Sequence, residues 1–229
     1  MIQLGSSELV VGVDVGGLAK GFHAVALRNQ RVTDKVHVEA AREIRDWCSS
    51  IGATTVGIDA PCRPSLEGYG RAAERALAGE RIFSFLTPTH DVAVTKAFYA
   101  WMLHGWELYG LLEPNYPLFT GGPIIGRTCF ETFPHAVACA LAGEVVSAKK
   151  KRVVRRALLR GAGVDDSALS NIDEVDATLC ALAANSLKRN AFRSYGDPLD
   201  GLIVVPLKSV GVRATDQGVG NAIRQLGPL

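Results

Sequence analysis

The sequence predicts an α/β protein built around a mixed sheet that is flanked by helices. The chain has 229 residues, of which 48% are hydrophobic, and this is ample for a packed core in a single domain over residues 1–229. Near the N-terminus, apolar side chains alternate with a period of two, which is typical of strands. Further along, runs with helical spacing separate the strand candidates, as they do where helices connect the strands of a sheet.

The first 38 residues predict three antiparallel strands. Residues 8–15 (ELVVGVDV) alternate between two faces, and Asp14 lies near the end of this run. A Gly-Gly pair then allows a tight turn, and apolar runs follow at hairpin distance over residues 22–27 and 32–38. We expect these strands to form a meander.

A helix and a parallel strand are predicted next. Residues 39–50 have helical spacing, and the strand 54–58 that follows ends at Asp59. The strand after this helical crossover should run parallel to the first strand, and parallel neighbours of similar length end at the same edge of the sheet, so Asp14 and Asp59 should lie together there.

The second half of the chain predicts one more strand with Glu131 near its end, three helices and a last apolar run. In chain order these elements are the strand 127–132, a short helix through residue 141, the helices 149–161 and 173–188, and the run 202–205.

The segment 81–126 between the two halves is unusually aromatic. It holds nine of the sixteen Phe, Trp and Tyr residues, so we expect a helical insertion rich in large side chains. Packing is the simpler explanation for these side chains, either in a helical subdomain or between two copies in a homodimer. A wall that stacks nucleic-acid bases is the alternative.

The composition excludes several classes of protein. A net charge of +2, from 25 Lys and Arg against 23 Asp and Glu, argues against a surface coated with basic residues. The five cysteines are odd in number and scattered, which indicates reduced thiols rather than disulfides or a zinc site. The N-terminus has no export signal, and charged residues and a histidine interrupt the longest apolar stretch, 91–112, which we expect to be a helix outside membranes. We therefore predict a cytoplasmic protein.

Acidic residues occur at the ends of several apolar elements. Two of them, Asp173 and Asp176, are three residues apart and so share one face of the last long helix. Asn171 and Glu174 fit a capping box at the start of that helix. The candidate catalytic residues are Asp14, Asp59, Glu131, Asp173 and Asp176.

Converging carboxylates need a cation or a proton. Unit charges 4 Å apart near a protein surface interact by roughly 4 kcal/mol. A set of oxygen ligands suits Mg²⁺ or Mn²⁺, and we predict that Asp14, Asp59 and Asp176 hold such ions. Two ions about 3.5–4 Å apart would support phosphodiester hydrolysis.

The motifs GVDVGG, VGIDAP, ETFP and DEVDATLCALAA occur in this order along the chain. With them the chain resembles the ribonuclease H-like superfamily, and in particular the predicted-nuclease family catalogued as domain of unknown function 429. The resemblance implies a mixed five-stranded sheet, with acidic metal ligands on the first strand, the fourth strand and the last helix. It also implies that Asp173 belongs to a D-x-x-D helix of the Holliday-junction resolvase type, and that Glu131 lies in an E-x-x-P motif. The catalytic Glu that ribonuclease H carries on its first helix has no match here.

A basic helix is predicted directly before the last helix. Its clustered cations neutralise phosphates without reading sequence, and a solvated amphipathic face is the alternative. The candidate nucleic-acid-binding residues are Lys149, Lys150, Lys151, Arg152, Arg155 and Arg156. The five histidines are dispersed, so we expect structural roles for them, with His135 as a candidate proton shuttle.

These patterns favour a hydrolase, a metal-dependent nuclease that cleaves DNA or RNA by a two-metal-ion mechanism. In this hypothesis Asp173 or Glu131 orients water or a second ion. The alternatives are a non-catalytic module that binds nucleic acid or protein, and an ATP-dependent phosphotransferase of the sugar kinase and Hsp70 type. The motifs of phosphate-loop NTPases and α/β-hydrolases are absent from the sequence.

Overall fold

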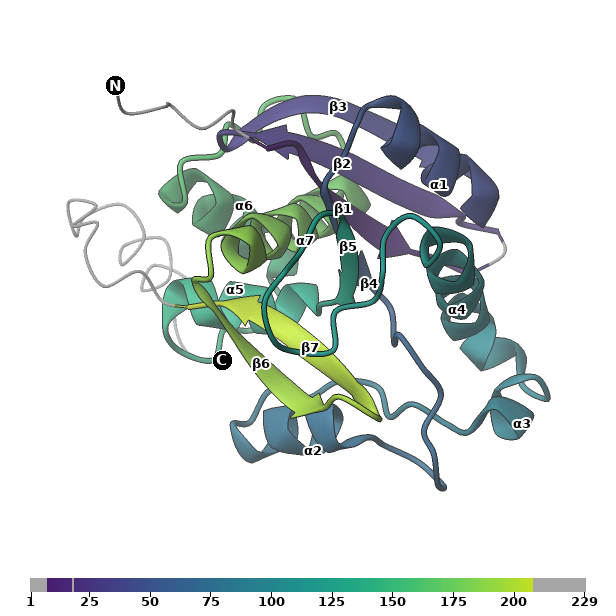
Figure 1. The fold of residues 1–229 in the computed structure, drawn as a ribbon. Coiled ribbons are helices and arrows are strands. Elements are labelled where there is room, and N and C mark those ends of the chain that lie inside the picture. The colour runs from purple at the N-terminus through teal and green to yellow at the C-terminus, as the bar shows by residue number, and fades with distance from the viewer. Residues whose placement is uncertain (1–7, 18, 208–229) are drawn as a thin grey trace.

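The computed structural model describes residues 8–17 and 19–207, which form a seven-stranded sheet with helices on both faces (Figure 1). The strand order is β3-β2-β1-β4-β5-β7-β6. The first three strands are antiparallel, and β4 and β5 run parallel to β1. This confirms the predicted mixed sheet, whose five strands are β1 (Val10–Val15), β2 (Phe22–Arg28), β3 (Arg31–Val38), β4 (Thr55–Asp59) and β5 (Thr128–Glu131).

A C-terminal hairpin extends the sheet by two strands beyond the expected five. Strand β7 (Gly201–Pro206) is the predicted apolar run and pairs parallel to β5. Strand β6 (Phe192–Asp197) forms the edge and was not predicted, because most of its side chains are exposed and its sequence, FRSYGD, carries little apolar signal.

Helices cover both faces of the sheet. Figure 1 shows α1 and α4 on one face, while α7 lies across the other with α5 and α6 beside it. Helix α2 packs on the β6–β7 hairpin. The helices are α1 (Ala41–Ser50), α2 (Ala72–Gly79), α3 (His90–Ala93), α4 (Ala100–Leu112), α5 (Pro134–Ala142), α6 (Lys151–Gly161) and α7 (Ile172–Lys188). In the part of the chain that the structure describes, none of them is long and apolar enough to cross a membrane.

The aromatic insertion divides into a core part and an exposed part. The stretch 91–112 is not one helix, because a 3₁₀ turn (Ala97–Tyr99) separates α3 from α4. Tyr109 and Tyr116 are buried against α1 and β1, as expected for packing. By contrast, Phe83 and Phe85 remain exposed. All five cysteines are free and buried, which agrees with reduced thiols.

Helix α7 touches the two central strands at glycines. A methyl group built on Gly12 of β1 would lie 1.9 Å from the carbonyl oxygen of Ala177, and one on Gly57 of β4 would lie 2.6 Å from that of Cys180. The helix backbone therefore rests directly on the sheet backbone. This contact fixes how far the acids of α7 stand from those of β1 and β4.

We expect Gly12→Ala to lower the free energy of unfolding by about 3 kcal/mol, because the new methyl group forces α7 away from β1. Gly110→Ala is the matched control, since Gly110 lies on α4 with no atom within 4 Å of its added methyl group. That variant should be neutral or gain about 0.5–1 kcal/mol, as expected for a helical Gly→Ala exchange. Denaturant unfolding measures both, and equal stability of the two variants would contradict the close contact.

Candidate metal centre

Register brings the predicted acids to one edge of the sheet. Asp14 lies directly opposite Asp59 in the parallel pair β1–β4, as predicted, and opposite His23 in the antiparallel pair β1–β2. Alternation along β1 turns Gly12 and Asp14 toward α7, while the intervening valines enter the core under α1 and α4. Helix α7 starts at this edge and contributes Asp173 and Asp176 from its first two turns.

The tightest group of candidate ligands is Asp14, His23 and Asp173. One carboxylate oxygen from each aspartate and one ring nitrogen of His23 lie within 4.8 Å of one another. The Nδ1 atom of His23 is buried and has no hydrogen-bond partner in the structure. Its ring is held in place by stacking on His37, with the ring centroids 4.1 Å apart. A buried histidine that has a ring nitrogen without a partner and that lies next to two carboxylates fits a metal ligand.

This group differs from the ligand set expected from the sequence. Asp59 and Asp176 lie beside it, close enough for their charges to interact with that of Asp14. His23 belongs to the group, although the sequence predicts a structural role for this histidine. The signal in the sequence was the hairpin itself, because pairing β1 with β2 across the Gly-Gly turn sets His23 opposite Asp14. Dispersed histidines have no ligand spacing along the chain, so only the register reveals this one.

Side chains of the protein partly neutralise these acids. The Lys20 ammonium lies 2.5 Å from Asp173 Oδ1 and 3.5 Å from Asp14 Oδ2. Asp176 forms a buried ion pair with Arg155, and Lys151 Nζ lies 3.8 Å from its other oxygen. Lys20 therefore occupies the place between two aspartates where a metal ion would relieve the same repulsion.

The remaining repulsion appears in the pKa values of the carboxyl groups. Burial, together with the charges of Asp176 and Asp173, raises the pKa of Asp14 to about 6, although Lys20 opposes the shift. Burial and the neighbouring Asp14 raise the pKa of Asp59 well above its usual range. Burial also raises the pKa of Asp176, against the opposing charge of Arg155. Such raised pKa values are typical of carboxylates gathered at a functional site.

Glu131 occupies a different environment from the other acids. Its two oxygens accept hydrogen bonds from Arg71 at 2.5 and 2.8 Å, and one also accepts a hydrogen bond from the backbone N–H of Cys62. Arg71 is only 1% exposed and also pairs with Glu74. Arg71 thus binds both glutamates, and Glu131 fixes the wall of a cavity rather than facing the tight ligand group.

Only part of the basic segment faces the surface. Helix α6 begins at Lys151, and Lys149 and Lys150 precede it. Arg155 and Arg156, which we expect to bind nucleic acid, instead turn toward the protein. Arg155 is only 6% exposed and pairs with Asp176, and Arg156 pairs with Asp166. The other four predicted cations line a surface cavity together with the residues that precede and begin α7, namely Lys149, Lys150, Lys151, Arg152, Ser170, Asn171 and Ile172.

The start of α7 is held by hydrogen bonds. The Asn171 side chain caps the helix by accepting from the backbone N–H of Glu174 at 2.8 Å, as the capping pattern predicts. The Glu174 carboxylate accepts from the backbone N–H of Ser170 and from Lys35 of β3, rather than from the cap residue. These contacts anchor the first turn, which carries Asp173, to the sheet.

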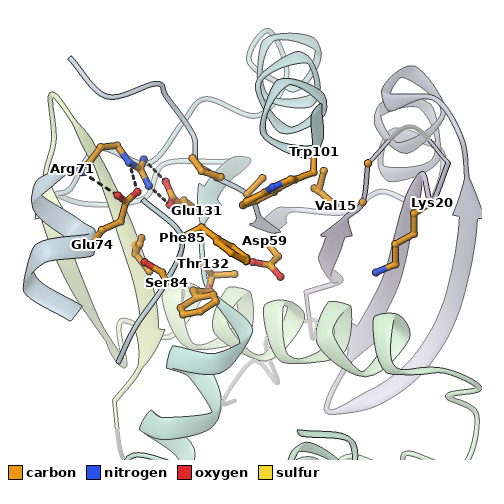
Figure 2. A pocket seen from close by; sticks show the side chains of 16 residues that line it. Val15, Lys20, Asp59, Arg71, Glu74, Ser84, Phe85, Trp101, Glu131 and Thr132 are labelled. Atoms are coloured by element: carbon orange, nitrogen blue, oxygen red, sulfur yellow. Dashed lines mark hydrogen bonds and ion pairs between the residues drawn. The ribbon is translucent and has the colours of Figure 1, made fainter. Parts of the chain in front are cut away.

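A second cavity opens on the other side of the acids. Figure 2 shows Phe85 between the Arg71–Glu131 pair and Asp59, with Trp101 above Asp59 in this view. These residues and Lys20 line a cavity of about 330 Å³. His135, the candidate proton shuttle, lies beside Cys139, with its Nε2 atom 3.9 Å from the sulfur.

Comparison with known proteins supports the family resemblance. Residues 12–200 match the family described as protein of unknown function (DUF429). The chain belongs to this family. The DUF429 match covers all five predicted acids, and the order and directions of β1 to β5 are those expected for the ribonuclease H-like fold.

Two further comparisons complete this finding. No curated protein matches the chain. Among solved structures, the DUF429 protein is similar to Thermus thermophilus RuvC, with a TM-score of 0.45 and 13% sequence identity over 80% of this chain and 96% of that one.

The raised pKa of Asp14 makes stability depend on pH. Folded, metal-free protein keeps a proton on Asp14 up to about pH 6, whereas the unfolded chain releases it near the ordinary value of 3.8. The folded state binds more protons between these values, so the free energy of unfolding falls as the pH rises through this window. Asp14→Asn removes the charge. We expect the free energy of unfolding of this variant to exceed that of the wild type by about 2–3 kcal/mol at pH 8 but not at pH 3.5.

Thermal unfolding in a chelating buffer at both pH values measures this difference. Asp46→Asn is the control, because Asp46 is an exposed aspartate on α1. An Asp14→Asn variant with the same pH dependence as the wild type would contradict the electrostatic description of the site.

Proposed function

We propose that the protein is a metal-dependent nuclease that hydrolyses phosphodiester bonds in DNA or RNA. The observation that carries the proposal is the convergence of Asp14, His23 and Asp173 within 4.8 Å, with Asp59 and Asp176 beside them. A cavity lined by four cations lies next to the same end of α7, where it would receive the phosphates of a strand. Acids for metal ions and cations for phosphates thus meet at one edge of the sheet.

The donor set suits a divalent ion of the hard or borderline class. Asp14, His23 and Asp173 would hold one ion, while Asp59 and Asp176 supply carboxylates for a second, in a two-metal-ion mechanism. Bound divalent ions would provide a water activated for attack and neutralise the charge that develops on the phosphate. A set that mixes carboxylates with an imidazole favours Mn²⁺ over Mg²⁺, because imidazole binds the later metals more readily.

The chain's own side chains have separate tasks in this proposal. Lys20 offsets the carboxylates until an ion enters, and its long exposed side chain can then leave without disturbing β1. Arg155 keeps Asp176 in place through a buried ion pair. Lys149, Lys151 and Arg152 are exposed and would bind phosphates without reading the sequence. The buried, free thiols agree with a cytoplasmic location.

Cleavage of labelled nucleic acid tests the proposal. We expect Mn²⁺ and, more weakly, Mg²⁺ to support cleavage of a single-stranded or duplex oligonucleotide of DNA or RNA, and a chelator to abolish it. Asp14→Asn should lower the rate at least about 100-fold, because changes even in the groups that support metal ligands cost 10- to 100-fold. Asp46→Asn should cleave at the wild-type rate, because Asp46 is an exposed residue of α1 that is not part of the acidic group.

Two outcomes would contradict the nuclease. Full activity in Asp14→Asn would remove the metal centre from the reaction. Salt-dependent binding without cleavage of any substrate in either metal would support a non-catalytic binding module on the same fold.

The part of His23 can be measured without a substrate. We expect His23→Ala to weaken Mn²⁺ binding about 10- to 100-fold in titration calorimetry, while Mg²⁺ binding changes less. His90→Ala is the control, since His90 lies exposed at the start of α3. Equal Mn²⁺ affinity in His23→Ala and the wild type would exclude His23 as a ligand and leave only carboxylates to bind the ion.

A further inference from the structure

The cavity beside Asp59 differs in chemistry from the cationic cavity. Lys20 and Asp59 are among the residues that line it and connect it to the metal centre, and most of its lining surface is apolar, with aromatic rings. We propose that this cavity binds an unpaired base of the nucleic-acid strand whose phosphates reach the metal centre. The inference rests on the proposed nuclease function and narrows its substrate to strands with unpaired nucleotides.

The aromatic rings of Phe85 and Trp101 line the cavity. Phe85 is 61% exposed although it is a large apolar residue, and its ring lies 6.1 Å from that of Trp101 and 5.5 Å from that of Phe98. Figure 2 shows Phe85 and Trp101 facing the space next to Asp59. Exposed aromatic faces beside a phosphate-binding surface are what single-strand-binding sites use, because every base has a face that can stack.

The polar groups of the cavity favour a neutral ligand. Arg71 is saturated by Glu74 and Glu131, so it offers no free charge to an acidic molecule. The hydroxyl of Thr132 is also engaged, because it donates to the carbonyl oxygen of Val204. In contrast, the buried Ser84 hydroxyl has no partner in the structure. A planar, uncharged base would fill the apolar space without needing an ion pair from these groups.

Position decides between an unpaired base and a paired one. Asp59 lines the aromatic cavity, and the cationic cavity borders the start of α7, the helix that carries Asp173 and Asp176, so we expect one strand that crosses the metal centre to contact both. The volume of about 330 Å³ is in the range of small-ligand pockets and accommodates one base. A base inside a duplex is stacked and paired, and entering the cavity would require unpairing it first.

Binding to oligonucleotides in a chelating buffer tests this inference apart from cleavage. We expect fluorescence anisotropy to show tighter binding of a labelled single strand than of the corresponding duplex. Phe85→Ala should weaken single-strand binding about tenfold, because stacking on one aromatic side chain typically contributes this much or more. Phe83→Ala should stay within twofold of the wild type, since Phe83 is 71% exposed on the same loop but does not line the cavity.

A second arm replaces single bases by abasic sites. If the cavity holds a base, one abasic position in a short strand should weaken binding about as much as Phe85→Ala, and the two changes together should add little. Equal binding of intact and fully abasic strands, or equal effects of Phe83→Ala and Phe85→Ala, would overturn the inference. Loss of cleavage in metal-loaded protein would bear on the nuclease alone, because the binding assay contains no metal.

Discussion

The direct contact between helix α7 and the two central strands is the constraint on which the candidate site depends. Glycines at positions 12 and 57 let the helix backbone reach the backbone of β1 and β4, and the following residue on the same face of each strand is an aspartate. A side chain at either glycine would separate the carboxylates of the sheet from those of the helix. The sheet and α7 therefore act as one rigid support, which is what a metal centre requires of its ligands.

Charge is arranged around this support in compensating groups. Carboxylates at the sheet edge raise one another's pKa values, and Lys20 and Arg155 offset part of their repulsion. Arg155 and Arg156 belong in sequence to the basic segment, but they form ion pairs with Asp176 and Asp166. The net charge of +2 thus conceals a segregation, in which a few exposed cations lie next to an acidic edge.

The buried ion pair of Arg71 and Glu131 stabilises one wall of the aromatic cavity beside Asp59. It joins the loop after β4 to the end of β5 and, through Glu74, to the backbone of Thr87. Thr87 belongs to the segment after α2 that exposes Phe85 next to the cavity. Breaking such a buried pair leaves an uncompensated charge, so the network is suited to hold an otherwise weakly packed aromatic loop in one position.

Much of this protein is determined by local sequence. Alternation along β1, the helical crossover and the Asn171 cap specify the mixed sheet, the shared edge of Asp14 and Asp59, and the start of α7, because periodicity and capping act within a few residues and a helical crossover leaves the two strands parallel. Tertiary structure decided the rest. The pairing of His23 with Asp14, the burial of Arg155 and the capture of Glu131 by Arg71 join residues whose relation depends on register and packing. A side chain's partners are set by what the fold brings within a few ångströms, which spacing along the chain does not encode.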